Sequence, residues 1–220
     1  MNERSFRKVS AMSIVSEELE KKFNEWFEQS VPDKGTRQIL LTAIEVFAKK
    51  GLVGTKIKDI ATKAGFSQGF VYNYFKSKDD IFTRVVELAS EGAVKSVKYI
   101  SEQKGSPYQK IYWLTEAFLY SDSIAMQHWR LIALQAATSE AIPEDAKKRS
   151  KEKNKETLQC FIPIIIEGQK TGEIVDEDPV ILAIAYFSFI QGLGITRVQS
   201  GKDIPFPSIE MVLGFLKKKK

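Results

Sequence analysis

The sequence predicts an all-α protein, and three observations support that prediction. Apolar residues recur at helical spacing in one segment after another, and capping residues stand where these segments begin. The one apolar run that resembles a strand, residues 161–166, contains Pro163, which would interrupt the hydrogen bonding of a sheet. We therefore expect this run to lie in a long helix that the proline kinks.

An amphipathic helix is predicted near the N-terminus, within an extension of residues 1–32. Ser16, followed by two glutamates, forms a helix start, and apolar residues then recur at i, i+4, i+7 and i+8. The helix should cover about residues 16–30 and end before Pro32. Its apolar face needs a partner, on this chain or on another molecule. The residues of that face are Leu19, Phe23, Trp26 and Phe27.

Residues 33–80 are predicted to form a compact domain of short helices. Asp33, Thr55 and Ser67 each stand where a helix should start, and glycines follow the first two helices. Ser77 and Asp80 form a capping box for a longer helix that continues to about residue 100. The three helices before it should cover residues 33–50, 55–64 and 68–74.

The helical pattern continues through residues 81–220, which we expect to form a second domain. A Gly-Ser-Pro turn at residues 105–107 lies within it, and an acidic segment with Pro179 marks the start of a late apolar helix. The helices expected after the turn cover about residues 107–121, 124–138, 144–170, 178–199 and 207–217.

The composition argues against several kinds of site. Cys160 and His128 are the only cysteine and histidine, so we expect no disulfide, no zinc site and no cofactor. One cysteine fits a reducing compartment, and we expect a cytoplasmic protein. Residues 179–196 carry no charge but are short for a membrane span, so a helix buried in a protein interface is the better interpretation.

Positive charge is concentrated in the domain of short helices. The chain has a net charge of +5, and residues 33–80 carry nine Lys and Arg against five Asp and Glu. A basic surface attracts polyanions, and nucleic acid is the first candidate.

The segment from Thr55 to Lys78 has the pattern of a helix-turn-helix, because two short helices flank a glycine turn. The second helix of this motif enters the major groove of DNA. Val71 and Phe75 should face inward, which leaves tyrosines exposed on the opposite side. Exposed aromatic residues indicate a partner, and Gln68 can pair with adenine or other base edges.

The run TRQILLTAIEVFAKKG…TKIKDIATKAGFSQGFVYNYFKSKDDIF resembles the DNA-binding domain of the TetR family of transcriptional regulators. The resemblance covers about residues 33–82 and rests on the Ile-Ala…Ala-Gly turn and on the Tyr-x-Tyr-Phe-x-x-Lys ending. Phe70 departs from the family, which usually has a small residue or threonine there. From the resemblance and the local charge, the predicted DNA contacts are Thr55, Lys56, Gln68, Gly69, Phe70, Tyr72, Tyr74, Lys76 and Lys78.

The resemblance also implies a homodimer that binds a pseudo-palindromic DNA operator and a cavity for a small effector. Two late helices of each chain would pair in a four-helix bundle, through Ile165, Ile181, Ile184, Ala185, Phe189, Gly192 and Ile195. An effector cavity would involve aromatic residues, which favours an apolar or aromatic ligand, although for each of them taken singly ordinary core packing is the better interpretation. These are Trp113, Phe118, Tyr120, His128, Trp129, Phe161 and Tyr186.

Two alternatives to a ligand-controlled repressor remain. An enzyme would need a nucleophile–base pair, a metal cluster or a phosphate loop, and the sequence offers none of these patterns. A helix-turn-helix regulator controlled by a protein partner is the other alternative, with the helix over residues 16–30 as the docking element. An apolar cavity within residues 107–190 would favour the small ligand, whereas a filled core and an exposed Phe23/Trp26/Phe27 face would favour the protein.

Overall fold

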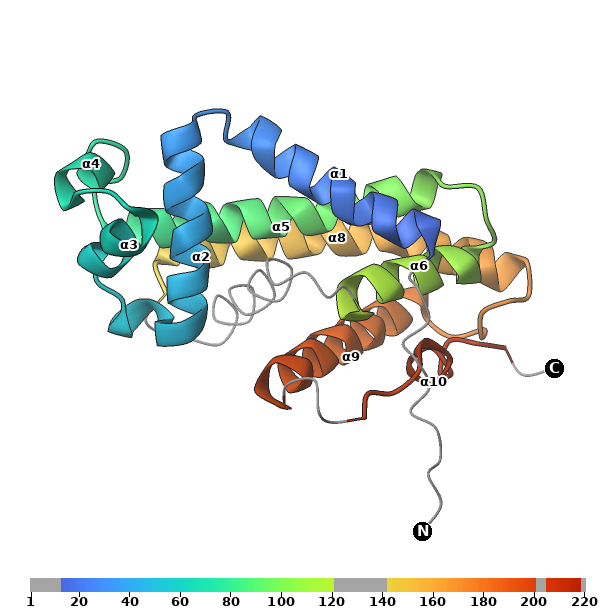
Figure 1. Cartoon of the computed structure of the whole chain (residues 1–220). Helices are drawn as coiled ribbons and strands as arrows, with labels where there is room; N and C mark the ends of the chain where they lie inside the picture. The colour runs from blue at the N-terminus through green and yellow to red at the C-terminus, as the bar shows by residue number, and fades with distance from the viewer. Residues whose placement is uncertain (1–12, 121–141, 201–204, 219–220) are drawn as a thin grey trace, which may run out of the picture.

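The computed structural model describes residues 13–120, 142–200 and 205–218, and every named element in these ranges is a helix (Figure 1). The all-α prediction is confirmed, and the helix predicted over residues 124–138 lies outside the described residues. The helices are α1 (Ile14–Ser30), α2 (Lys34–Gly54), α3 (Ile57–Ala64), α4 (Gln68–Tyr72), α5 (Lys78–Glu102), α6 (Pro107–Tyr120), α8 (Glu144–Lys170), α9 (Pro179–Ser200) and α10 (Ile209–Val212).

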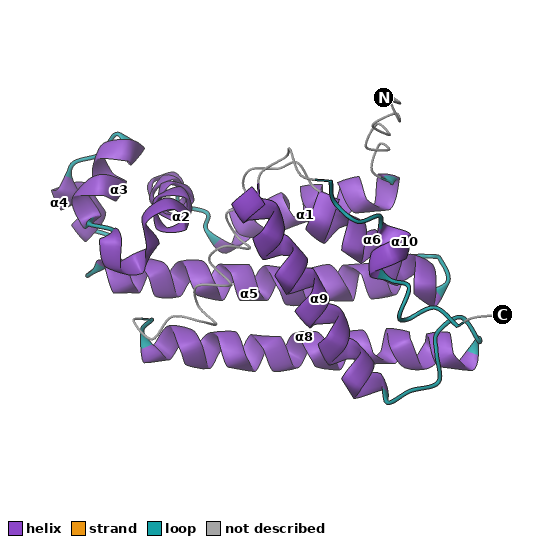
Figure 2. Cartoon of the chain, turned by 90° about the horizontal axis from the view of Figure 1, so that it is seen from below, coloured by secondary structure: helices purple, strands orange, loops and turns teal. Residues whose placement is uncertain are grey.

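Two predicted details of the late helices differ from the structure. Helix α8 runs through Pro163 without a break, so the expected kink is not seen (Figure 2). The last helix was expected over residues 207–217 but covers only Ile209–Val212. The residues after it leave the helix because they pair with the α8–α9 turn: Val175 N donates to Leu216 O at 2.9 Å, and Lys218 N donates to Glu173 O at 3.0 Å.

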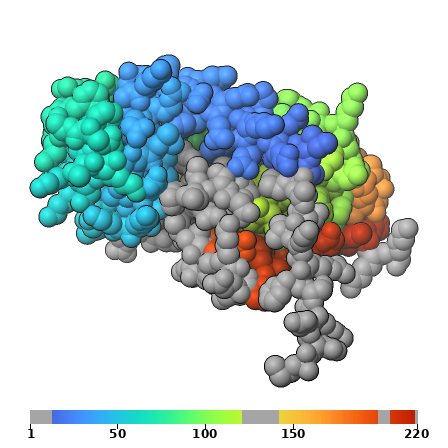
Figure 3. Space-filling model, in the orientation of Figure 1, coloured from blue at the N-terminus to red at the C-terminus, as the bar shows by residue number. Residues whose placement is uncertain are grey.

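The long helices α5 and α8 lie side by side and form the most extensive helix pair of the described chain (Figure 2). Helices α2, α3 and α4 gather at one end of this pair, and α6, α9 and α10 cover the other end (Figure 1). Helix α1 runs back from the start of α2 along α5 to α6, and its atoms form a continuous ridge over this length (Figure 3).

The buried side chains form two hydrophobic cores. The first core joins α2, α3 and α4 to the start of α5, where the rings of Phe47 and Phe82 meet edge to face with centroids 5.1 Å apart. The second core joins α6, α8, α9 and α10 to the far half of α5. Helix α1 contributes Phe23 to the first core and Leu19 to the second. The apolar face of α1 is therefore docked on its own chain.

A buried carboxylate fixes the N-terminal end of α1 to α6. The hydroxyl groups of Ser13 and Ser16 donate to Glu116 Oε2 at 2.5 and 2.6 Å, and Ser13 N donates to the same oxygen at 3.0 Å. The Glu116 side chain is buried, so these bonds replace the water that a charged carboxylate would otherwise keep. Because Ser13 also caps α1, the start of the helix and its attachment to α6 are one feature.

The middle of α1 approaches α5 so closely that only glycine fits at position 92. A Cβ at Gly92 would lie 2.2 Å from Cε2 of Phe23, well inside van der Waals contact. The Phe23 side chain is itself buried, so its ring has little room to move. Trp26 meets Tyr99 of α5 edge to face, with ring centroids 6.3 Å apart.

We predict that Gly92→Ala detaches α1 from α5 and lowers the free energy of unfolding by about 1–3 kcal/mol, because the added methyl group overpacks the contact. Chemical denaturation measures the loss, and hydrogen exchange should show faster exchange in α1. Gly54→Ala is the matched control, since its Cβ would meet nothing closer than 3.6 Å. Unchanged stability and exchange in the Gly92 variant would contradict the packing described here.

Candidate DNA-binding site

Helices α3 and α4 are joined by a tight turn whose geometry requires glycine. Gly65 adopts φ 76° and ψ 22°, the left-handed conformation that ends a helix, and Phe66 N donates to Ala61 O at 2.9 Å. Ser67 then caps α4, because its Oγ accepts a hydrogen bond from Phe70 N at 3.1 Å. The predicted helix-turn-helix is present.

Helix α4 buries one side and exposes the other, as predicted. Val71 and Phe75 are buried in the first core. Gln68 and Gly69 are exposed, and Tyr72 is 54% exposed although it is a large aromatic residue. This exposed surface, called the recognition face below, consists of Gln68, Gly69 and Tyr72.

Phe70 and Tyr74 belong to an aromatic ladder within the domain. The ring centroids of Phe66 and Phe70 lie 4.3 Å apart, and those of Phe70 and Tyr74 lie 5.1 Å apart. The ladder also reaches α2, because a Cβ at Gly35 would lie 3.1 Å from Tyr74 Oη and 3.2 Å from Phe70 Cζ. Phe70 is half-buried, so its unusual side chain packs the recognition helix against α2 in addition to any contact with DNA.

Thr55 does not fit its predicted role as a DNA contact. Its side chain is 1% exposed, and its hydroxyl donates to Gly51 O at 2.6 Å. Thr55 N donates to Leu52 O, so the residue closes α2 and does not cap α3. The cap of α3 is the next residue, Lys56, whose N donates to Asp59 Oδ2 at 2.9 Å, and the helix starts at Ile57. That hydrogen bond, with Lys50 nearby, holds the pKa of Asp59 below its usual range.

Lys78 also differs from its predicted role. Its ammonium group turns back toward the end of α2 and donates to the carbonyl oxygens of Leu52, Val53 and Thr55, at 2.9, 3.3 and 3.1 Å. Lys56 and Lys76 are exposed, as a contact with phosphate requires. Lys34, also exposed, is a further candidate for a phosphate contact, because it lies in the first turn of α2 next to Gly35, which approaches the aromatic ladder. Sequence reasoning missed it because the ladder joins segments far apart in the chain.

The predicted cavity residues are divided between core and partly buried positions. Phe161 and Tyr186 are fully buried with rings stacked 4.6 Å apart, and Tyr186 Oη lies 2.9 Å from Thr115 Oγ1, so both act as core residues. Trp113, Phe118 and Tyr120 are half-buried. The Tyr120 hydroxyl donates to Pro207 O, and burial raises the pKa of Tyr120 to about 12. His128 and Trp129 lie outside the described residues.

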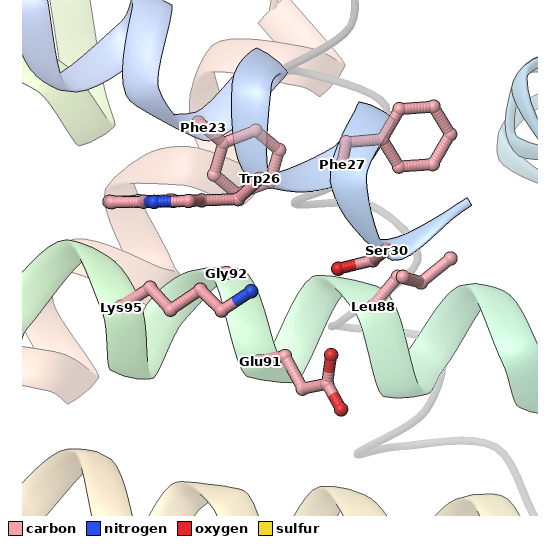
Figure 4. Close-up of a pocket in the computed structure, with 8 residues that line it drawn as sticks. All are labelled: Phe23, Trp26, Phe27, Ser30, Leu88, Glu91, Gly92 and Lys95. Carbon is pink, nitrogen blue, oxygen red and sulfur yellow. The ribbon is translucent and has the colours of Figure 1, made fainter. Parts of the chain in front are cut away.

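A small hollow, open to solvent and with room for about one water molecule, lies between α1 and α5 (Figure 4). Phe23 and Trp26 project from α1 into this seam, and Lys95 and Glu91 lie opposite them on α5 (Figure 4). The hollow marks where α1 docks and does not contain the predicted cavity residues. Its lining consists of Phe23, Trp26, Phe27, Ser30, Leu88, Glu91, Gly92 and Lys95.

Most of the predicted pairing residues lie on one exposed side of α9. Ile181, Ile184 and Phe189 are 64%, 51% and 53% exposed, and Gly192 is exposed beside them. Ala185 and Ile195 are half-buried. Ile165 was predicted on this surface but is fully buried in the second core, because its side of α8 faces into the protein.

Metal binding has no evident site in the described ranges, where no group of three or more His, Cys, Asp or Glu side chains comes together. Cys160 is a free thiol, half-buried on α8.

The chain is similar to known transcriptional regulators. Residues 39–85 match the sequence model of bacterial regulatory proteins of the tetR family. The uncharacterized HTH-type transcriptional regulator YfiR of Bacillus subtilis is 35% identical over 72 residues, which span 33% of this chain and about a third (35%) of YfiR. The HTH-type transcriptional repressor KstR2 of Mycolicibacterium smegmatis is 28% identical over 152 residues, or 65% of this chain and 69% of KstR2.

The similarity extends to solved structures beyond the helix-turn-helix. A candidate transcriptional regulator from Saccharomonospora viridis, solved in complex with choline, has a TM-score of 0.65 and 25% identity, over 82% of this chain and 92% of that one. An exposed face on the second helix of a helix-turn-helix is the arrangement with which such motifs enter the major groove of DNA. Residues 39–85 therefore carry a DNA-binding domain of the tetR family of bacterial regulatory proteins, and the relatives named above are transcriptional regulators.

We predict that Gln68→Ala and Tyr72→Ala each weaken binding to a specific operator by about 1–3 kcal/mol, the range for a lost base contact. Fluorescence anisotropy at fixed salt, on an operator selected from random DNA, measures the change. Gln29→Ala is the matched control, since Gln29 is also an exposed glutamine but lies on α1. Unchanged affinity in both recognition-face variants would show that α4 does not read the operator.

Proposed function

We propose that the chain is a transcriptional repressor that binds a pseudo-palindromic operator as a homodimer and releases it when a small apolar or aromatic ligand binds. The observation that carries the proposal is the recognition face of α4, which exposes Gln68 and Tyr72 on a helix-turn-helix. KstR2 is a transcriptional repressor, which supports repression as the direction of control. The Saccharomonospora protein was solved with choline bound, which supports the use of a small ligand.

Dimerisation through α9 is supported by the distribution of its side chains. One side, with Ala183, Tyr186 and Ile190, is buried against the second core, and the opposite side exposes Ile181 and Ile184. An exposed apolar surface of this kind marks an interaction site. A second copy of the chain fits it, because a two-fold dimer would place two recognition helices on two half-sites of DNA.

The same helix also raises the question of a membrane. Residues Pro179–Arg197 of α9 are long and apolar enough to cross one by length and composition, with 28% of the segment buried in the chain. Burial of one whole side against the second core argues for a helix of a bundle. We therefore propose a protein partner for the exposed side and a cytoplasmic location for the dimer.

Ligand control requires a path from the second domain to the DNA-binding domain. Two helices connect the domains: α5 extends from the first core into the second, and α1 joins α6 to the start of α2. Close to α2, Arg84 Nη2 of α5 donates to Ser30 O at 3.1 Å. A ligand that favours one position of α6 over another would shift both connections. The shift in the equilibrium between the two forms is limited by the difference in the ligand's affinity for them.

The alternative of a protein effector loses its main argument. It depended on an exposed apolar face of α1, but Phe23 is buried and Trp26 and Phe27 are half-buried against the first core. The feature that still favours it is the filled core around Phe161 and Tyr186, where an effector cavity was expected.

Selection of bound sequences from random DNA should yield a pseudo-palindrome, because each copy contributes one recognition helix. A ligand screen on the resulting complex, read by anisotropy, should find apolar or aromatic compounds that release the DNA and raise the melting temperature of the free protein. A selected site without two-fold symmetry would contradict the homodimer. Release only by another protein would contradict the small-ligand proposal.

We predict that Ile184→Glu gives a monomer at micromolar concentration and weakens operator binding at least tenfold, because a buried charge opposes the pairing of α9 with its copy. Sedimentation velocity measures the mass. Ile14→Glu is the control: Ile14 is 77% exposed but lies at the start of α1, so this variant should remain a dimer. A wild-type monomer would overturn the interface.

A further inference from the structure

We propose that Lys78 is a positioning residue that fixes the end of α2 to the start of α5, and that it is not a phosphate contact. The geometry is a single ammonium group facing three backbone carbonyl oxygens, those of Leu52, Val53 and Thr55, at 2.9–3.3 Å. An ammonium group has three N–H donors, so the number of donors matches the number of acceptors. The proposal rests on the proposed function only for its DNA-binding test.

The position of Lys78 in its own helix is electrostatically unfavourable. It is the first residue of α5, after the cap Ser77, and the N-terminus of a helix carries partial positive charge. The two residues that follow, Asp79 and Asp80, fit that field, whereas a lysine does not. A cation at this position is explained if its charged group binds acceptors outside its own helix.

The end of α2 is where a cation is favoured. Gly51, with φ 68° and ψ 171°, separates the last turn of α2, residues 52–54, from the regular part of the helix, and the carbonyl groups of a last turn have no following turn to donate to them. Lys78 Nζ accounts for Leu52 O and Val53 O, and the Thr55 hydroxyl accounts for Gly51 O. Lys78 therefore completes the C-terminal cap of α2 from a residue 26 positions later in the chain.

This cap controls the placement of the recognition helix. Gly51 has φ 68°, so the chain changes direction just before the carbonyl groups that Lys78 binds, and α3 begins only two residues after Thr55. The contact thus holds the α2–α3 connection against the start of α5. These two places flank the segment that contains α3 and α4, so the contact closes that segment at both of its ends. Without it, the angle at which α4 meets DNA is less restricted.

The experiment compares Lys78→Met with Lys76→Met, because both remove one charge beside α4 but Lys76 is exposed. The melting temperature and the hydrogen exchange of residues 52–56 are measured on the free protein, and affinity for the selected operator is measured from low to high salt. A lost phosphate contact reduces the slope of log K against log salt by about 0.9 for each copy of the chain on the operator. A lost helix cap leaves the slope unchanged.

We expect Lys78→Met to lower the melting temperature by roughly 3–10 °C, to speed exchange at residues 52–56, and to keep the wild-type salt slope. Lys76→Met should leave the melting temperature and the exchange unchanged and reduce the salt slope. Lys78→Arg separates the roles again: a phosphate contact would be retained, but the planar guanidinium cannot direct its donors to three converging carbonyls as the ammonium does, so the melting temperature should fall.

A shallower salt slope for Lys78→Met, with unchanged melting temperature and exchange, would overturn the proposal. If the wild-type protein selects no DNA, the proposed function fails, but the measurements on the free protein still decide whether Lys78 fixes α2. If Lys78→Met does not fold, the melting temperature of Lys78→Arg decides the same question.

Discussion

The contact between Phe23 of α1 and Gly92 of α5 constrains the whole arrangement. It fixes α1 on α5, and α1, like α5, contributes to both hydrophobic cores. At this point the two helices approach until no Cβ fits at position 92. On either side of it, α1 reaches α6 through the Glu116 hydrogen bonds and reaches α2 through a connection of three residues. The DNA-binding domain is thus held from both of its ends, by α1 before α2 and by α5 after α4.

The parts of the site that were predictable from sequence are those that local chemistry determines. Gly65 in the left-handed conformation, Ser67 as a cap, and Val71 and Phe75 facing inward all follow from residues within a few positions of one another. The same holds for α8, whose bounds agree with the prediction because an acidic start and a glycine end mark them. Capping and periodicity act over one or two turns, and sequence displays them directly.

The parts that were not predictable depend on distant pairs. Thr55 resembles a helix cap in sequence, but its amide and hydroxyl both close the preceding helix, and the decision is made by the path of the chain after Gly51. Lys78 resembles a surface cation, but its three acceptors lie more than twenty residues earlier. Phe70 acquires its role from Gly35 on another helix. No spacing rule relates such residues.

Helix α9 shows the limit of periodicity most clearly. Its residues are apolar on nearly every side, so the sequence indicates burial without saying which side meets the core and which meets a partner. Folding divides them: Tyr186 stacks on Phe161 inside the chain, while Ile181 and Ile184 remain outside. On α8 the assignment reverses between neighbours, since Ile165 is buried and Ile166 is exposed. Whether a residue lies in an interface therefore depends on how the helices pack. Neighbouring residues of one helix face different sides, so one can face a partner while the next faces the core.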